Sequence, residues 1–348
     1  MASKTSKQND SYRKLREQLK GGTVGGVYIF YGVEKYLCSR CLEEIRTLLV
    51  PQGFEEFNLH RLQGKGLTIQ ELTEAAEAMP MMAEHTLITV TDLDIFRLEE
   101  GQRQLLIRLL EDFPDYCTLI FVYDLLEYKR DGKMKKLTAA LDKHVSEVEF
   151  AQQDRQALLG WVRRRFAALG HDISPATMDH LLFTCGSLMT DLVPEIEKIG
   201  AYAKEKEITV ADINAVAQPV LDARVFDMTN SITQGKYDAA AVALGELLRM
   251  QTDPIAILAA VGKELRRLYT ARMALDSGKD RAWLQQLWHM SSDYPAKLLL
   301  QAAAKVDHRW CSTALTACQT LDRRMKSEKN IDREAELKQF LMELAGRR

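Results

Sequence analysis

The first 150 residues alternate between short apolar runs and longer amphipathic segments. The apolar runs are rich in β-branched and aromatic residues and predict strands at 27–31, 57–62, 86–91, 117–123 and 145–150. Between them, apolar residues at helical spacing predict helices at 36–49, 68–79, 100–112 and 133–142. Strands that alternate with helices of this length are typical of βαβ units. The pattern therefore predicts an α/β domain with a mainly parallel sheet.

After the fifth predicted strand the pattern changes, and no later run predicts a strand. Asp154 and Ser174 are suited to cap helix N-termini, and Pro175 fits the first helical turn after Ser174. The predicted helices cover 154–169, 174–184, 188–205 and 209–217. This segment should form a small helical domain that ends at Gln218-Pro219.

The remainder of the chain is also predicted to be helical. Asp253-Pro254 marks a helix start and Ser277-Gly278 marks a helix stop. The predicted helices cover 223–234, 237–250, 254–276, 281–289, 294–305, 308–326 and 331–346. We therefore predict three domains, at 1–150, 151–217 and 218–348.

Composition indicates a globular protein without an overall nucleic-acid signature. Of 348 residues, 46% are hydrophobic and 28% are charged, and the net charge is −2. No apolar run has the length of a membrane span. Residues 1–12 are polar, lack the apolar segment of a signal peptide and are predicted to be a loose tail, so we expect a cytoplasmic location. The six scattered cysteines favour reduced core thiols over a disulfide framework.

The turn after the first strand tests whether the α/β domain could bind a nucleotide. It reads Tyr31-Gly-Val-Glu-Lys-Tyr-Leu37. A phosphate-binding loop needs several glycines and a Lys-Ser/Thr pair, but this turn has one glycine and the chain has no Gly-Lys-Ser/Thr. Glu34 would also place negative charge near the phosphate position. The sequence therefore predicts the architecture of a nucleotide-binding ATPase without the residues that bind phosphate and magnesium. No cofactor is expected.

Other candidate chemistry is weaker. Asp92 and Asp94 follow the third predicted strand and could hold magnesium, but without a phosphate loop a capping role is favoured. Cys38 and Cys41 form a single Cys-x-x-Cys, which favours helix packing with Cys41 inward over a metal or redox site. The seven histidines are dispersed and suggest no ligand cluster.

Two basic stretches are candidates for phosphate contact with DNA. Lys133, Lys135 and Lys136 form the first, and Lys263, Arg266 and Arg267 lie in one long predicted helix. A solvated face is the default explanation for either stretch, and phosphate contact is the alternative. Any contact with the backbone would be independent of DNA sequence.

Residues 78–83, Ala-Met-Pro-Met-Met-Ala, form a corner before the third predicted strand. Pro80 disfavours helical geometry at Met79, so the preceding helix should end here. Met81 and Met82 cannot both face one core, and at least one should point outward. Exposed methionines are adaptable anchors for a hydrophobic pocket on another protein. The alternative is ordinary packing at a helix end.

Five segments, in this order, resemble motifs of the delta subunits of bacterial DNA polymerase III clamp loaders, and the resemblance covers nearly the whole chain. They are Tyr31-Gly-Val-Glu-Lys-Tyr-Leu37, Ala78-Met-Pro-Met-Met-Ala-Glu-His85, Leu192-Val-Pro-Glu-Ile-Glu-Lys198, Val225-Phe-Asp-Met-Thr229 and Leu321-Asp-Arg-Arg-Met-Lys-Ser327. Two departures occur. Met81-Met82 stands where the family often has Leu-Phe or Phe-Phe, and Glu328 replaces a usual glycine.

The resemblance implies an AAA+-like α/β domain with a degenerate nucleotide site, a small helical lid domain and a helical collar domain. It implies a subunit of a DNA-directed DNA polymerase (nucleotidyltransferase) holoenzyme without a catalytic site of its own. Met79, Pro80, Met81 and Met82 would bind the ring-shaped beta sliding clamp and help to open it. The other partners would be the tau/gamma and delta prime subunits in a hetero-pentamer, and primed DNA through that complex, in the cytoplasmic, nucleoid-associated replisome. No membrane partner is expected.

Two other functions stay open at this point. One is an active AAA+-type ATPase with an unusual nucleotide site, which ATP binding would support. The other is a stand-alone DNA-binding adaptor, which co-purification with a multi-subunit loader would contradict.

Overall fold

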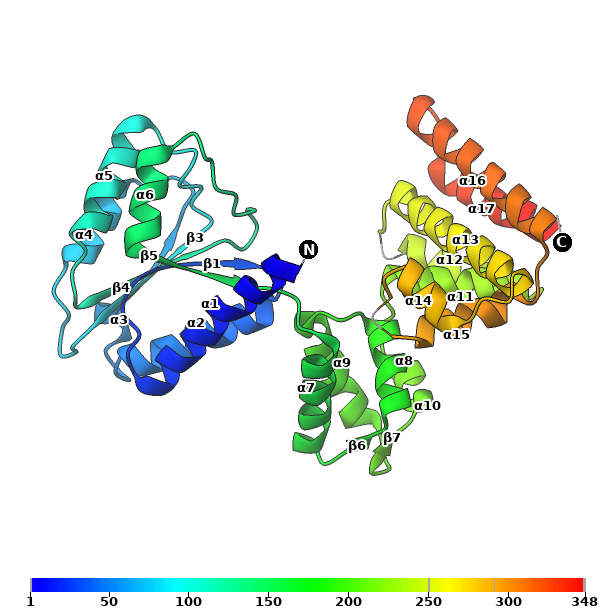
Figure 1. The fold of residues 1–348 in the computed structure, drawn as a ribbon, viewed down its shortest axis with the longest axis horizontal. Coiled ribbons are helices and arrows are strands. Elements are labelled where there is room, and N and C mark those ends of the chain that lie inside the picture. The colour runs from blue at the N-terminus through cyan, green and yellow to red at the C-terminus, as the bar shows by residue number, and fades with distance from the viewer. Residues whose placement is uncertain (1, 250, 291, 347–348) are drawn as a thin grey trace. The chain divides into compact units, whose positions relative to one another are not determined.

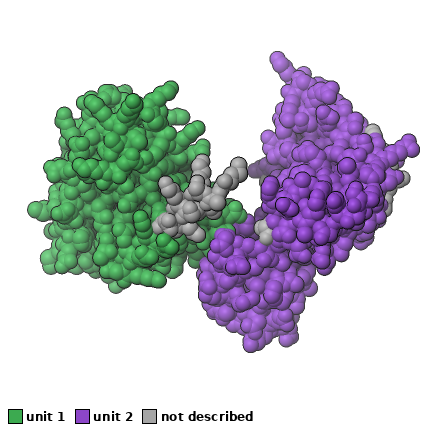
Figure 2. All heavy atoms as spheres, viewed as in Figure 1, with its two compact units in different colours: residues 1–153, 188–190 green, residues 154–187, 191–348 purple. Residues whose placement is uncertain are grey.

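A computed structural model describes residues 2–249, 251–290 and 292–346. They form two compact units, which Figure 2 shows in green and purple. Unit 1 contains the residues up to 153 together with 188–190, and unit 2 contains 154–187 and the residues from 191 onward. Unit 1 has nearly the extent of the first predicted domain. The other two predicted domains fall within unit 2, and the division into three domains, with a boundary at 217–218, stays a prediction.

Unit 1 is built on a five-stranded sheet in the order β2-β3-β4-β1-β5, in which all neighbouring strands are parallel (Figure 1). The strands are β1 (Gly26–Gly32), β2 (Leu59–Gln63), β3 (Thr86–Thr91), β4 (Cys117–Val122) and β5 (Val145–Phe150). The predicted mixed architecture with a parallel sheet is thus confirmed. One strand boundary was wrong, because residues 55–58 form a helical turn, α3 (Glu55–Asn58), before β2 begins.

Helices cover both faces of this sheet. They are α1 (Ala2–Gly21), α2 (Lys35–Leu49), α4 (Ile69–Glu77), α5 (Glu100–Glu111) and α6 (Lys135–His144). Side chains alternate along β1, so Val27 and Ile29 pack with the α4–α6 layer, whereas Tyr28 and Phe30 pack with α1 and α2. The sheet is therefore buried on both sides, as parallel sheets are.

The prediction of a loose tail at residues 1–12 was wrong for residues 2–12, since α1 begins at Ala2, and residue 1 lies outside the described residues. Tyr12, Leu15 and Leu19 recur at helical spacing and pack against the face of the sheet that α2 also covers. Leu15 is almost fully buried there. The Tyr12 ring meets Phe150 edge to face with centroids 5.7 Å apart. The polar first residues continue a helix whose apolar contacts lie further along, so they carry little hydrophobic signal of their own.

Four helices follow the sheet along the chain: α7 (Arg155–Ala168), α8 (Pro175–Cys185), α9 (Met189–Tyr202) and α10 (Val210–Val216). They belong to unit 2 except for the first two residues of α9, which belong to unit 1. The predicted caps are confirmed, because Asp154 accepts a hydrogen bond from the Ala157 amide and Ser174 accepts one from the Thr177 amide. The expectation of no strand was wrong in one detail. Two-residue strands, β6 (Asp172–Ile173) and β7 (Glu207–Ile208), pair in parallel, and they are too short to give a periodic pattern.

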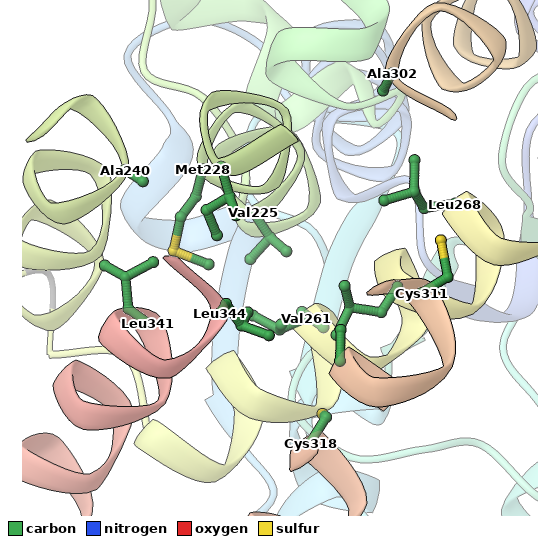
Figure 3. Close-up of a cluster of buried hydrophobic side chains, with 14 of the residues drawn as sticks. Val225, Met228, Ala240, Val261, Leu268, Ala302, Cys311, Cys318, Leu341 and Leu344 are labelled. Carbon is green, nitrogen blue, oxygen red and sulfur yellow. The ribbon is translucent and has the colours of Figure 1, made fainter. Parts of the chain in front are cut away.

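The remaining helices of unit 2 share one core. They are α11 (Leu221–Thr233), α12 (Tyr237–Arg249), α13 (Pro254–Asp276), α14 (Arg281–Leu287), α15 (Tyr294–Ala303), α16 (His308–Ser327) and α17 (Arg333–Gly346). Figure 3 shows side chains from several of them meeting around Val261, including Val225, Cys311 and Leu344. All six cysteines are buried free thiols, as the sequence indicated. None of the described helices is long and apolar enough to cross a bilayer.

Candidate functional site

The corner between α4 and β3 lies at the amino end of a central strand. A capping box of Thr68 and Glu71 starts α4, which ends at Glu77 as Pro80 predicted. The Tyr116 hydroxyl donates to the Glu77 carbonyl at 2.9 Å, and the Tyr116 carbonyl accepts from the Thr86 amide at 2.8 Å. One residue therefore fixes both the end of the helix and the start of the strand.

The methionine side chains of the corner point outward. Met79, Met81 and Met82 are 79%, 52% and 77% exposed, and Pro80 is half-buried. The prediction that at least one of Met81 and Met82 faces solvent is confirmed, and packing of both in the core is excluded. Large apolar side chains gathered on one short exposed segment are a feature of protein-binding surfaces.

The backbone of the corner is held from a distant part of the chain. Asn58 at the end of α3 is fully buried, and its Oδ1 accepts from the Met81 amide while its Nδ2 donates to the Met81 carbonyl, both at 2.8 Å. Sequence reasoning missed this residue because Asn58 was placed inside a predicted strand. Asparagine is depleted in strands, and this preference argued against placing Asn58 in a strand.

Two further features shape this surface. Phe57 is 51% exposed. It directly precedes Asn58, the residue that binds Met81, so the Cα atoms of Phe57 and Asn58 are about 3.8 Å apart. Met82 has φ 53°, in the left-handed region that residues other than glycine seldom adopt. The corner therefore has a left-handed backbone at Met82, and an exposed aromatic residue directly precedes Asn58 in the sequence.

In the turn after β1, residues 32–37, the charged side chains are held by the protein, whereas the methionine side chains of the corner are exposed. Gly32 has φ 127°, and a Cβ there would lie 2.4 Å from the Phe150 carbonyl oxygen, so only glycine fits. The buried Glu34 carboxylate accepts from the Met189 amide at 3.1 Å. Lys35 donates to the Tyr123 carbonyl at 2.9 Å and lies 3.4 Å from Asp124. The charged side chains of this turn are held by protein groups at the place where a phosphate would bind in an ATPase.

Asp92 has the capping role that the sequence favoured. Its carboxylate accepts from the amides of residues 124, 125 and 126 at 2.9–3.0 Å and so fixes the loop after β4. Asp94 accepts from the Phe96 amide and pairs with Arg97 at 3.2 Å. Within the described ranges, no group of three or more His, Cys, Asp or Glu side chains is arranged to hold a metal ion.

The Cys38–Cys41 pair lies inside the protein, as expected for Cys41. Burial raises the pKa of Cys38 to about 12 and that of Cys41 to about 11. Both side chains are therefore thiols at neutral pH, whereas thiolates are the reactive form. The packing interpretation of this motif is supported.

The two basic stretches lie in different units of the chain, the first in unit 1 and the second in unit 2. Lys133, Lys135 and Lys136 line a pocket of about 350 Å³ at the start of α6, which Glu100 and Arg103 also line. In unit 2, Lys263 pairs with Asp222 at 2.5 Å. Contact of these lysines with DNA stays a prediction.

The other cations of the α13 stretch differ in exposure. Arg266 is exposed, whereas Arg267 lies 3.8 Å from Glu264 and 5.7 Å from the centre of the Trp288 ring. Glu264 is nearly fully buried, and this burial raises its pKa to about 7. Arg266 is therefore the most accessible cation of the three predicted on this helix, and its contact with DNA is also untested.

Two family models match the chain. The model described as DNA polymerase III, delta subunit, matches residues 28–151, which contain the turn and the corner. The model of the C-terminal domain of the same family of delta subunits matches residues 222–344. The chain belongs to the DNA polymerase III delta subunit family. The family suggested by five short segments is thereby confirmed.

Relatives of this delta-family chain are similar along most of its length. DNA polymerase III subunit delta of Bacillus subtilis is 23% identical over 335 residues, which are 95% of this chain and 96% of the relative. The probable subunit delta of Aquifex aeolicus is 21% identical over 263 residues, 73% of each chain. The solved Bacillus subtilis DNA clamp loader delta protein has a TM-score of 0.50 and 22% identity, over 96% of this chain and 99% of the other. That likeness supports the fold.

Proposed function

We propose that this chain is a clamp-loader subunit that binds the beta sliding clamp through Met79, Pro80, Met81 and Met82. The observation that carries the proposal is the row of exposed methionines on a backbone fixed by Asn58 and Tyr116. A pre-ordered backbone lowers the entropy cost of binding. Flexible thioether side chains can adapt to a pocket that accepts aromatic residues in relatives.

The methionines offer enough apolar surface to anchor a complex. Burying one methionine side chain contributes roughly 1.5–3 kcal/mol. Met81 and Met82 are both more than half exposed, so most of that contribution is still available to a partner. Two such anchors can account for several orders of magnitude in affinity, since each tenfold corresponds to about 1.4 kcal/mol.

Clamp opening would follow from differential binding. A ligand shifts a conformational equilibrium only by binding one state more tightly than the other. The corner should therefore bind a clamp whose ring is open at one interface more tightly than a clamp whose ring is closed. ATP held by partner subunits would control access to the corner.

The remaining parts of the proposal concern the rest of the chain. The AAA+-like domain would have no ATPase activity of its own, which the internally held charges of Glu34 and Lys35 support. Helices α7–α10 would form the lid. Helices α11–α17 would form the collar that joins tau/gamma and delta prime subunits in the cytoplasmic replisome.

The test is the double variant Met81→Ala/Met82→Ala in the full chain. It should weaken binding of the organism's sliding clamp by roughly 100-fold or more, because truncating a central anchor costs about 2 kcal/mol or more. Its melting temperature should stay within about 2 °C of wild type, because both side chains are exposed. The measurements are clamp affinity by surface plasmon resonance and thermal melting.

A matched control is available in the same unit. Leu125 and Leu126 form another exposed apolar pair, which Asp92 holds at the opposite edge of the sheet. Leu125→Ala/Leu126→Ala should leave clamp affinity unchanged. Equal losses for both double variants would mean nonspecific apolar adhesion, and unchanged affinity of the methionine variant would refute the proposed function.

A further inference from the structure

Asn58 is a buried polar side chain whose hydrogen bonds serve the corner. Its Nδ2 donates to the carbonyls of Phe54 and Met81, and its Oδ1 accepts from the Met81 amide. An amide excluded from water is retained at low cost only when it is hydrogen-bonded in this way. Asn58 thus pairs with both backbone groups of one residue, as a neighbouring strand would, across 23 positions of sequence.

The corner has few other backbone restraints. Within the described part of the chain, the hydrogen bonds that reach residues 79–84 are the two between Asn58 and Met81. Tyr116 holds Glu77 and Thr86, which lie on either side of this stretch. Without Asn58, the segment between these two points would be free to sample other conformations.

Met82 makes this restraint more important. Its left-handed backbone is uncommon for a residue with a side chain, and such geometry persists where surrounding contacts hold it. Met81, the adjacent residue, is the one that Asn58 holds at both its amide and its carbonyl. The directions of the two exposed methionines therefore depend on one buried amide.

We propose that Asn58 is a positioning residue for clamp binding, which holds Met81 and Met82 in their binding geometry before the clamp arrives. This inference rests on the proposed function of the corner. Asn58 makes no contact with the clamp in this scheme, because it is fully buried. It acts by keeping the corner almost entirely in the competent conformation.

The consequence is kinetic. Apparent affinity falls in proportion to the fraction of molecules in the competent conformation. If the unrestrained corner is competent about a tenth of the time, the association rate constant should fall about tenfold. The dissociation rate constant should change less than about threefold, because the same methionines fill the same pocket once bound. Truncating the methionines should instead act mainly on dissociation.

The experiment compares Asn58→Leu with wild type in the full chain. Leucine keeps the approximate shape and removes all three hydrogen bonds. We expect an association rate constant for the sliding clamp about tenfold lower and little change in dissociation. Asn58→Asp, which sets an acceptor against the Met81 carbonyl, should lower association at least as much. Hydrogen exchange in the wild-type chain should show the Met81 amide more protected than the Met82 amide, whatever the folding of the variants.

A control for general destabilisation is Glu34→Ala, which removes a buried hydrogen bond far from the corner and should leave association unchanged. The inference is overturned if Asn58→Leu associates at the wild-type rate while Met81→Ala/Met82→Ala binds weakly, or if the Met81 amide exchanges freely. If the methionine variant also binds normally, the proposed function itself fails and this inference fails with it.

Discussion

Two turns of the same sheet use their residues in opposite ways. The turn at residues 32–37 follows the carboxyl end of β1, and the corner at 78–85 precedes the amino end of β3, so they lie at opposite edges of the parallel sheet. In the turn, Glu34 and Lys35 are held by backbone groups of the protein. In the corner, the backbone is held and the apolar side chains are exposed.

Under the proposed function, the edge that carries the corner is the one that faces a partner. The Glu34 carboxylate is buried and accepts a hydrogen bond from the Met189 amide, so we expect its loss to affect stability. The Met79 and Met82 side chains are more than three-quarters exposed and contribute little to the core, and in the proposed function they bind another surface. Substitutions in the two places should therefore have opposite effects: loss of binding at the corner and loss of stability at the turn.

The largest effect should come from charge at the corner. Met82→Asp should weaken clamp binding by roughly 1,000-fold or more, because it removes an anchor and buries an unpaired carboxylate in the complex. Val33→Asp is the matched change in the turn, where Val33 is also exposed, and it should leave clamp affinity unchanged. Affinity and melting temperature of both variants give the comparison, and equal losses would abolish the distinction between the two edges.

A substitution in the turn should have an intermediate effect, which should appear in the free energy of unfolding and not in clamp affinity. Glu34→Ala removes the acceptor for the Met189 amide and should lower the free energy of unfolding by about 1–3 kcal/mol. Clamp affinity should stay within about twofold at temperatures where the variant is folded. Denaturant melts and clamp titrations measure the two quantities. A variant that keeps its stability but loses clamp binding would show that the turn serves binding.

The smallest effect is expected at the margin of the corner. Phe57→Ala should weaken clamp binding about threefold, because Phe57 lies beside Asn58 and contacts at the rim of an interface contribute little. Affinity measured with the same clamp preparation would resolve this change. Leu48→Ala, an exposed residue of α2, is a control that should have no effect. A loss as large as that of the methionine pair would make Phe57 a central anchor and extend the surface onto α3.

Much of the fold was predictable from local patterns. The strands of unit 1 lie within a residue or two of their predicted positions. The caps at Asp154 and Ser174 and the end of α4 before Pro80 were also predictable, since each depends on a few neighbouring residues. The absence of a phosphate-loop motif and the exposed methionine corner could also be predicted, because each depends on a short run of residues.

Local sequence patterns were sufficient to predict the parallel sheet of unit 1, the turn without a phosphate loop and the position of the corner. That residues 2–12 are helical depends on tertiary packing, because α1 contacts the sheet through Tyr12, Leu15 and Leu19, at the end of this segment and beyond it. Tertiary structure also decided the role of Asn58, which looks like an unsuitable strand residue until Met81, 23 positions away, is placed against it. Hydrogen bonds between distant segments leave no periodic pattern in a sequence, because they depend on where the chain returns in space.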